Sequence, residues 1–522
     1  MIVVGVDFGT QSVRATILDA DAGKLLSSAA QGYAVQRSAD DPLLVTQSHY
    51  DQMTALQAAV SAALRASETP GDAVVGMACS ATSSSVIVTD EHLQPITDYY
   101  LWCDHRAHKE AQEITQAAHA RGFEGIQWCG GTYSHEWGFA KLLHFLRHNP
   151  DLRSSAALAL ENCDMITATL CGVSGPDDLV RSTCAMGHKW MWGTPWGGFP
   201  DDAFLGEVDP LLAEASQMLR GKVVPQGGVA GYLSDEWAQK LGLRAGISVG
   251  VGAIDAHWDA VGAGASRGDM VNIIGTSTCL IGVLPGQARA VRGVSGVVPG
   301  SVLPDGIGIE AGMSAVGDLF QSVARRNNSD LVAMTDSLNA EPRRITGLVR
   351  IPWDNGDRTI LVDANLGGVL VGLDLEHTAL DELQAAIEGT ALQTRLILDH
   401  IGTQMVPFER IINGGGIPPK NPFLNQVYAD ILNRPVCVPK TPTTGIGAGI
   451  FAAVAAGLFP SVEDAQAAFC PEFDVIEPDP AFVARYDETY EVFHTLYHAL
   501  GNREAGQQAE ALKILRRQRV GQ

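Results

Sequence analysis

Apolar residues near the start of the chain follow a strand period and then a helix period. Residues 3–6, 13–18 and 24–35 predict three strands separated by turns. Residues 50–66 carry apolar side chains at steps of three and four, which predicts an amphipathic helix that covers the sheet. Residues 73–79 predict a further strand. The predicted order is therefore β-β-β-α-β.

The second half of the chain opens with the same pattern. Residues 270–274 predict a strand, a Gly-Thr turn follows, and residues 279–284 predict the partner strand. A chain of 522 residues is also too long for one hydrophobic core. We therefore predict an α/β protein made of two related lobes.

The boundary between the predicted lobes falls in a segment rich in glycine and alanine, residues 253–264, which can serve as a hinge. This places an N-terminal domain at 1–256 and a C-terminal domain at 257–522. Residues 177–225 are dense in Trp, Gly and Pro and show little regular periodicity. They predict a long surface insertion over a pocket.

A phosphate-binding turn is predicted at the end of the first strand, at Gly9, Thr10, Gln11 and Ser12. A strand that stops at glycine exposes consecutive backbone N–H groups, and Thr and Ser hydroxyls add donors. Asp7 stands where a Mg²⁺ ion carried in by a nucleotide needs a carboxylate, directly or through water.

A similar turn, Gly275-Thr276-Ser277-Thr278, follows the strand predicted at 270–274. One such turn is weak support, because Gly-Thr after a strand is usually only a tight turn. Two matching turns far apart in one chain predict that both hold the same phosphate tail.

Three consecutive glycines, Gly414, Gly415 and Gly416, follow a further apolar run. They allow very close approach of the backbone, and Asn421 can cap a helix whose first turn holds Pro422. Taken alone, the segment is better explained as a sharp turn. Together with the two phosphate turns, it predicts a platform for adenine and ribose.

Asp255 is an acidic residue among small and apolar neighbours at the predicted hinge. Transfer of a phosphoryl group to an alcohol needs a carboxylate that accepts the hydroxyl proton. We assign Asp255 as this general base, with helix capping as the alternative role.

Lys189 and Glu310 are charges embedded among apolar and small residues. Buried charges need partners, and the hydroxyls of a polyol offer several. An internal ion pair explains each of them equally well, so both interpretations stay open.

Composition excludes several classes of partner. The formal net charge of −23 and pI near 4.9 create a field that repels nucleic acid and anionic membranes.

The nine cysteines include no C-x-x-C pair, which is typical of reduced cytosolic thiols. Met1 leads directly into a strand without a signal peptide, so a cytoplasmic protein is expected. Residues 446–459 fall short of the ~20 apolar residues of a membrane helix and predict a buried helix.

These features together resemble the FGGY carbohydrate kinases over nearly the whole chain. The resemblance rests on the two Gly-Thr turns and on residues 133–141, 252–257, 368–373 and 413–422. The family belongs to the sugar kinase, actin and Hsp70-type ATPase superfamily, which implies two ribonuclease H-like lobes with a central cleft. Within the family, residues 181–192, 275–279 and 310–318 are similar to those of ribulokinases.

The resemblance implies a cytoplasmic enzyme of pentose metabolism, such as arabinose catabolism. It would use ATP and Mg²⁺ to phosphorylate the C5 hydroxyl of a ketopentose, most simply ribulose, giving ribulose 5-phosphate and ADP. Asp255 matches the family's base and Asp7 its carboxylate near Mg²⁺. The other matches are sugar contacts at Ala81, Lys189 and Glu310 and nucleotide contacts at Gly275, Thr276, Gly414, Gly415 and Gly416.

Two segments depart from the ribulokinase pattern, residues 78–85 and 137–139. They leave D-ribulose, ribitol, xylulose or another pentulose open as the substrate, and a homodimer also stays open. A rival from another class is an actin- or Hsp70-like ATPase without a sugar acceptor. That class has no need for a polar set such as Lys189, Glu310 and Asp255.

Overall fold

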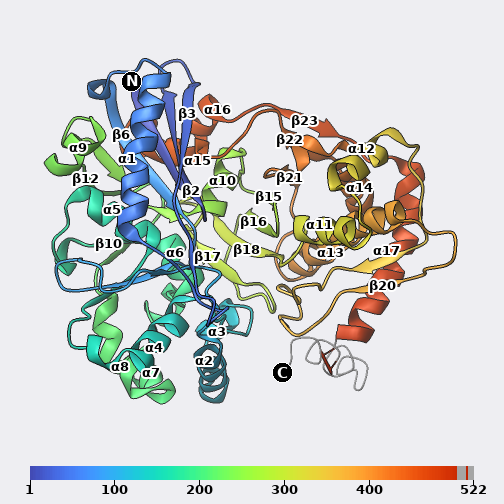
Figure 1. The fold of residues 1–522 in the computed structure, drawn as a ribbon, viewed down its shortest axis with the longest axis horizontal. Coiled ribbons are helices and arrows are strands. Elements are labelled where there is room, and N and C mark those ends of the chain that lie inside the picture. The colour runs from blue at the N-terminus through green and yellow to red at the C-terminus, as the bar shows by residue number, and fades with distance from the viewer. Residues whose placement is uncertain (502–512, 515–522) are drawn as a thin grey trace.

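The computed structural model describes residues 1–501 and 513–514 and contains two large mixed sheets (Figure 1). In the first sheet, β1 (Ile2–Phe8) pairs antiparallel with β2 (Ser12–Asp19) and parallel with β6 (Val74–Ala81). The full order is β12-β13-β6-β1-β2-β3, with β3 at Lys24–Gly32, β12 at Val229–Tyr232 and β13 at Ser248–Gly250. Helix α1 (His49–Ala66) packs on β2 and β3. The predicted β-β-β-α-β unit is confirmed.

The middle strands of the first sheet, β6, β1 and β2, are buried because a helix from the far end of the chain packs on the sheet in addition to α1. Helix α15 (Ile446–Ala455) packs against β1 and β6. A Cβ at Gly5 would lie 2.4 Å from the backbone of both Gly445 and Gly449, so this close approach requires glycine. The buried helix predicted at 446–459 is therefore present, and it completes the core of the first lobe.

The second sheet repeats the pairing of the first. Strand β15 (Asp269–Ile274) pairs antiparallel with β16 (Thr278–Leu284) and parallel with β21 (Arg410–Gly414). The order is β17-β18-β16-β15-β21-β22-β23, with β17 at Gly296–Pro299, β18 at Ile307–Met313, β22 at Val436–Pro439 and β23 at Phe473–Ile476. Helices α13 (Ala379–Gln404), α14 (Pro422–Leu432) and α17 (Pro480–Gly501) pack against one another in this lobe. The two-lobed α/β fold predicted from the sequence is confirmed.

Residues 177–225 are more regular than their composition suggests, and the prediction of an irregular surface excursion is wrong. They form β10 (Val180–Ser182), α6 (Thr183–Lys189), α7 (Asp202–Val208), α8 (Pro210–Glu214) and β11 (Lys222–Val224). Arg181 is fully buried, and its guanidinium donates to the carbonyls of Ala159, Met218 and Arg220. Tertiary packing thus orders a segment whose local sequence carries little periodicity.

A smaller third sheet carries part of the wall of the site. Its order is β4-β5-β8-β7-β9, with β4 at Gln36–Arg37, β5 at Val45–Gln47, β8 at Tyr99–Tyr100, β7 at Val86–Thr89 and β9 at Leu158–Glu161. Nearby are α2 (His108–Arg121), α4 (Gly138–His148) and α5 (Asn162–Cys171).

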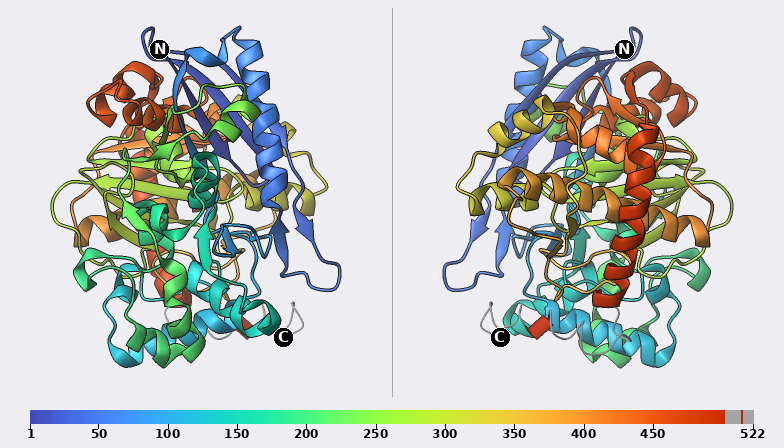
Figure 2. Two further views of the ribbon diagram at one scale, coloured as in Figure 1. Left: turned by 90° about the vertical axis from the view of Figure 1, so that its left-hand side faces the viewer. Right: turned by 90° about the vertical axis from the view of Figure 1, so that its right-hand side faces the viewer.

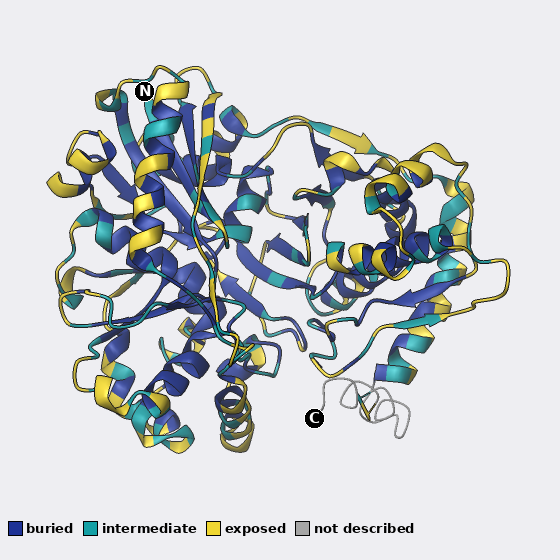
Figure 3. Ribbon diagram, in the orientation of Figure 1, coloured by how far each residue is buried: buried dark blue, intermediate teal, exposed yellow. Residues whose placement is uncertain are grey.

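The views in Figure 2 show the two lobes from either side, with the amino terminus at the outer end of the first lobe. The middle strands of both large sheets are dark blue in Figure 3, whereas edge strands such as β3 and the outer surfaces of the helices are exposed. Among the described residues, no helix is long and apolar enough to cross a membrane.

Candidate active site

Three residues predicted from the sequence meet at one edge of the first sheet. Asp7 on β1 pairs with Ser80 on β6, and Ala81 lies opposite both Phe8 and Ile254. The short strand β14 (Ala253–Ile254) leads directly into Asp255. Because neighbouring strands lie about 4.8 Å apart, Asp7, Ala81 and Asp255 stand side by side at the carboxyl ends of their strands. This is where α/β proteins place ligands.

Asp255 is the first residue of α10 (Asp255–Gly262), and its Oδ1 accepts a hydrogen bond from the backbone N–H of Ala256 at 2.8 Å. The cap position belongs to Ile254, so capping does not account for the carboxylate. Burial raises its pKa to about 7, and repulsion from Asp7 acts in the same direction. A carboxylate with a pKa near neutrality is well matched to proton transfer.

Asp259 was missed by the sequence analysis and belongs to the same acidic group. It lies on α10 one helical turn after Asp255. Burial raises its pKa well above the ordinary value, and Asp7 and Asp255 raise it further, while Arg14 opposes them. Burial also raises the pKa of Asp7, whose Oδ1 accepts from Ser80 Oγ at 2.8 Å. Each of the three carboxyls is therefore harder to ionise than an isolated one, because burial disfavours the charged form.

The first glycine turn is fixed by side chains from several elements. The N–H of Gly9 donates to the carbonyl of Ser12 at 3.0 Å. Trp102 Nε1 donates to Thr10 Oγ1 at 3.0 Å, and Tyr33 OH donates to the carbonyl of Gly9 at 2.6 Å. Such preorganisation suits a turn that binds an anion without rearranging.

The second glycine turn is closed by a similar but shorter hydrogen-bonded loop, because the N–H of Gly275 donates to the carbonyl of Ser277, two residues on, at 2.9 Å. The carbonyl of Thr276 accepts from the N–H groups of Val316 and Asp318, at the start of α11 (Gly317–Arg326). Both turns therefore lead from a strand into its antiparallel partner, as predicted.

The three consecutive glycines lie beside the second turn. Strand β21 runs parallel to β15, with Gly414 opposite Ile273, so both strands end at the same edge. Gly415 has φ of +87°, and a Cβ there would lie 2.5 Å from the carbonyl oxygen of Ile274. Glycine is required at this position. Asn421 caps α14, because its Oδ1 accepts from the N–H of Leu424 at 3.0 Å.

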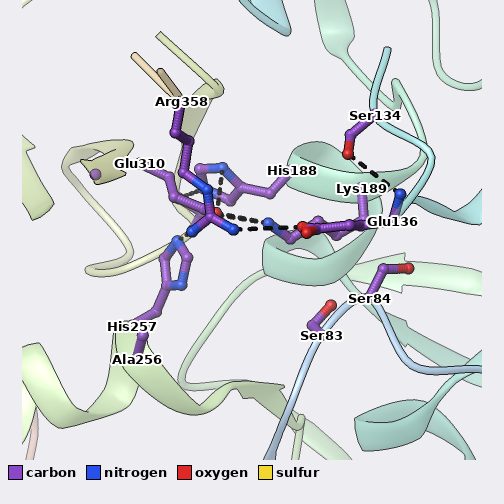
Figure 4. A network of polar contacts seen from close by, with 12 residues as sticks. Ser83, Ser84, Ser134, Glu136, His188, Lys189, Ala256, His257, Glu310 and Arg358 are labelled. Carbon is purple, nitrogen blue, oxygen red and sulfur yellow. Dashed lines mark hydrogen bonds and ion pairs between the residues drawn. The ribbon is translucent and has the colours of Figure 1, made fainter. Parts of the chain in front are cut away.

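Lys189 and Glu310 form a buried ion pair between α6 and β18 (Figure 4). Lys189 Nζ donates to Oε1 of Glu310 at 2.7 Å and to Oε2 at 2.9 Å. Burial alone would raise the pKa of Glu310, but Lys189 and two nearby histidines outweigh it and lower the pKa to about 2. The internal ion pair left open by the sequence is thus present, and each partner comes from a different lobe.

Two histidines flank the Glu310 carboxylate, as Figure 4 shows. His188 Nδ1 lies 3.6 Å and His257 Nε2 lies 3.7 Å from Oε2 of Glu310. Burial lowers the pKa of His257 to about 4 and that of His188 well below its usual value, so both rings are neutral near pH 7. His188 Nε2 is in addition 3.0 Å from Ser301 Oγ.

A second ion pair joins the lobes next to the first. Arg358 Nη2 lies 3.4 Å from Oε2 of Glu136, which precedes α4. Arg358 also lowers the pKa of Cys279, whereas burial, Glu310 and Asp255 raise it to about 11. Cys279 follows the second glycine turn on β16. Asp255 therefore lies within electrostatic range of the strand that leaves that turn.

Of the residues that the sequence analysis missed, one leaves a recognisable signal in the sequence and the others do not. Asp259 repeats Asp255 at a helical spacing and could have been found by that signal. Glu136 and Arg358 are 222 positions apart, and no local pattern connects them. The same holds for Glu161, discussed below.

The chain matches the model of the FGGY family of carbohydrate kinases over residues 2–262 for the N-terminal domain and 270–456 for the C-terminal domain. It is 34% identical to a ribulokinase from Vibrio parahaemolyticus, covering 95% of each chain. A ribulokinase from Shouchella clausii is 31% identical, with 96% of this chain and 95% of that protein covered.

Solved structures agree on the fold. A xylulose kinase from Rhodospirillum rubrum superimposes with a TM-score of 0.82 at 23% identity, covering 96% of this chain and 99% of the other. A glycerol kinase from Plasmodium falciparum with ADP gives a TM-score of 0.79 at 15% identity, covering 96% and 98%. At these identities the structures bear on the fold alone. The two family-model matches and the extent of identity to the curated relatives establish that the chain is a sugar kinase of the FGGY family of carbohydrate kinases.

Proposed function

We propose that this kinase transfers the γ-phosphoryl group of ATP to the terminal C5 hydroxyl of a ketopentose, ribulose in the first instance, giving ribulose 5-phosphate and ADP. The ribulokinase names of relatives at 34% and 31% identity support the choice of sugar. The observation that carries the mechanism is the Asp255 carboxylate, whose pKa of about 7 suits a general base.

In this mechanism, Asp255 accepts the proton of the sugar hydroxyl while oxygen bonds to the γ-phosphorus. Positioning supplies the larger share of the rate, since oriented reactants gain about 7–11 kcal/mol. Lys189 and the backbone at Ala81 hold the sugar from the first lobe, and Glu310 holds it from the second. Gly9 to Ser12 and Gly275 with Thr276 hold the phosphates, and Gly414 to Gly416 with Asn421 form the adenosine platform.

Asp7 would hold, through water, the Mg²⁺ brought in by ATP. The fit rests on its donor set, because Asp7 and Asp259 are buried carboxyls with raised pKa and no ion pair in the described residues. Such oxygens match the preference of Mg²⁺. When bound, Mg²⁺ supplies charge neutralisation for the transferring phosphate. We propose that the sugar lobe and the nucleotide lobe divide at residues 256 and 257, with α15 (Ile446–Ala455) returning to pack on the sheet of the sugar lobe.

A second candidate is another pentulose or pentitol, such as D-ribulose, xylulose or ribitol. It stays open because residues 78–85 and 137–139 are expected to depart from the ribulokinase pattern. An ATPase without a sugar acceptor is less favoured, because the relatives at 34% and 31% identity are ribulokinases.

The test is an ADP-release screen with L- and D-ribulose, xylulose, ribitol, hexuloses and glycerol at fixed ATP and Mg²⁺. We expect ribulose to give the highest kcat/KM. A higher value for another pentulose or a pentitol replaces ribulose by that sugar. ATP turnover that ignores every polyol contradicts the proposal.

A further inference from the structure

Glu161 is a buried carboxylate that lies apart from the Asp7 and Asp255 group. It ends β9 and is fully buried. Its Oε2 accepts from Ser83 Oγ at 2.9 Å and from the N–H of Ser85 at 3.1 Å. Its Oε1 accepts from Trp190 Nε1 at 2.8 Å and from Ser84 Oγ. Four donors match the four acceptor positions of a carboxylate.

Lys141 holds the same loop from the other side. It lies on α4 and is 1% exposed. Its Nζ donates to the carbonyls of Ser84 and Leu101, each at 2.6 Å. The loop at residues 83–85 is therefore fixed by a buried anion and a buried cation at once. Two buried charged side chains are more than a short loop of serines needs in order to fold.

The groups fixed by Glu161 belong to two walls of the proposed sugar site. The loop follows Ala81 directly, at the sheet edge beside Asp255. Trp190 follows Lys189, the partner of Glu310. Figure 4 draws Ser83 and Ser84 beneath the Lys189 and Glu310 pair. A single carboxylate thus sets the spacing between the two walls.

Two segments of the chain, residues 78–85 and 137–139, converge on this carboxylate. Ser83, Ser84 and Ser85 lie in the first segment and bind Glu161 directly. The second, 137–139, packs on Trp190, because a Cβ at Gly138 would lie 2.0 Å from the Trp190 ring. The Phe139 and Trp190 ring centroids are 5.3 Å apart. Both segments therefore contact or contain groups that Glu161 holds in place, namely the 83–85 loop and Trp190.

We propose that Glu161 is a positioning residue that determines which sugar the site accepts, acting through the 83–85 loop and Trp190. The proposal rests on the proposed function at the same site. Glu161 does not touch the reacting atoms. It keeps the loop and Trp190 at the separation that fits one arrangement of sugar hydroxyls and excludes others.

The test compares Glu161→Gln with wild type on ribulose, xylulose and ribitol. The Gln amide keeps one acceptor oxygen and its NH2 group accepts nothing, so the variant loses either the Oε2 pair of hydrogen bonds, from Ser83 and Ser85, or the Oε1 pair, from Ser84 and Trp190. We expect the ratio of kcat/KM between the best and second sugar to change by about tenfold or more. The sugar KM should rise more than kcat falls.

Asp164→Asn is the matched control. Asp164 is also a buried carboxylate, on α5, and accepts from the N–H of Ser182 at 2.9 Å, but it makes no hydrogen bond to the 83–85 loop. We expect this variant to lower Tm without changing the sugar ratio. Equal ratios for wild type, Glu161→Gln and Asp164→Asn would overturn the proposal and leave Glu161 a structural residue.

A readout without sugar separates this proposal from the proposed function. Either the Ser85 amide or the Trp190 indole N–H should exchange hydrogen faster in ligand-free Glu161→Gln than in wild type, with no such change in Asp164→Asn. Unchanged exchange at both groups overturns the positioning role. A wild-type enzyme that phosphorylates no pentulose or pentitol refutes the proposed function instead, and does so before any variant is made.

Discussion

Two buried acidic regions face the proposed reaction centre, and their electrostatics are opposite. At the edge of the first sheet, Asp7 and Asp255 repel each other, and burial raises the pKa of both. Between the lobes, Glu310 is equally enclosed, but Lys189 lies against both of its oxygens and its pKa falls to about 2. Burial is common to the two regions, and the neighbouring charge decides the outcome.

The difference in carboxyl pKa indicates different roles for the two regions. A carboxylate held at a pKa near 7 can exchange a proton during turnover, whereas one held near 2 stays charged and serves as a fixed acceptor for hydroxyl groups. Asp255 is therefore suited to chemistry and Glu310 to binding. Each of the following experiments tests one side of that contrast.

Removal of the base should have the largest effect. Asp255→Asn keeps the shape of the side chain but cannot accept the hydroxyl proton, so kcat should fall by about 10²- to 10⁴-fold. The KM values for sugar and ATP should change little. Initial rates of ADP release measure both quantities. A variant that retains wild-type turnover would show that the base lies elsewhere.

Breaking the ion pair should have the next largest effect, on binding and stability and less on turnover. Lys189→Met or Glu310→Gln leaves one buried charge without its partner, which destabilises by about 3–5 kcal/mol. The sugar KM should rise in both variants. Denaturant unfolding and sugar titration measure the two effects.

The double variant Lys189→Met with Glu310→Gln separates the effect on stability from the effect on sugar binding. It removes both charges, so stability should recover relative to either single variant while sugar affinity stays low. If sugar affinity recovers along with stability, the pair serves folding alone.

The sequence predicted the site residues at the sheet edge better than those between the lobes, because strand patterns are local and tertiary contacts are not. Asp7, Ala81 and Asp255 follow local strand and turn patterns, and strand pairing then brings their ends together. Glu136 with Arg358, and Glu161 with the 83–85 loop, meet through tertiary packing that leaves no periodic trace. Residues 177–225 were misjudged for the same reason, because burial of Arg181 and close packing at Gly187 order them.

The smallest effect concerns the pH dependence of stability, and it has opposite signs in the two regions. The folded-state pKa of Asp255, about 7, lies above its ordinary value of 3.8, so its contribution to stability is lost as pH rises through about 7. Ligand-free Asp255→Asn should therefore melt above wild type at pH 8, by about 2–4 °C for each kcal/mol recovered, and the gain should shrink toward pH 5. Glu310→Gln should melt below wild type at both pH values, because the lowered pKa of Glu310 keeps the pair charged throughout that range. Thermal melts of wild type and the two variants at pH 5 and pH 8 test this expectation. If Asp255→Asn raises Tm by the same amount at both pH values, the Asp255 carboxyl titrates normally. The contrast between the two regions then does not hold.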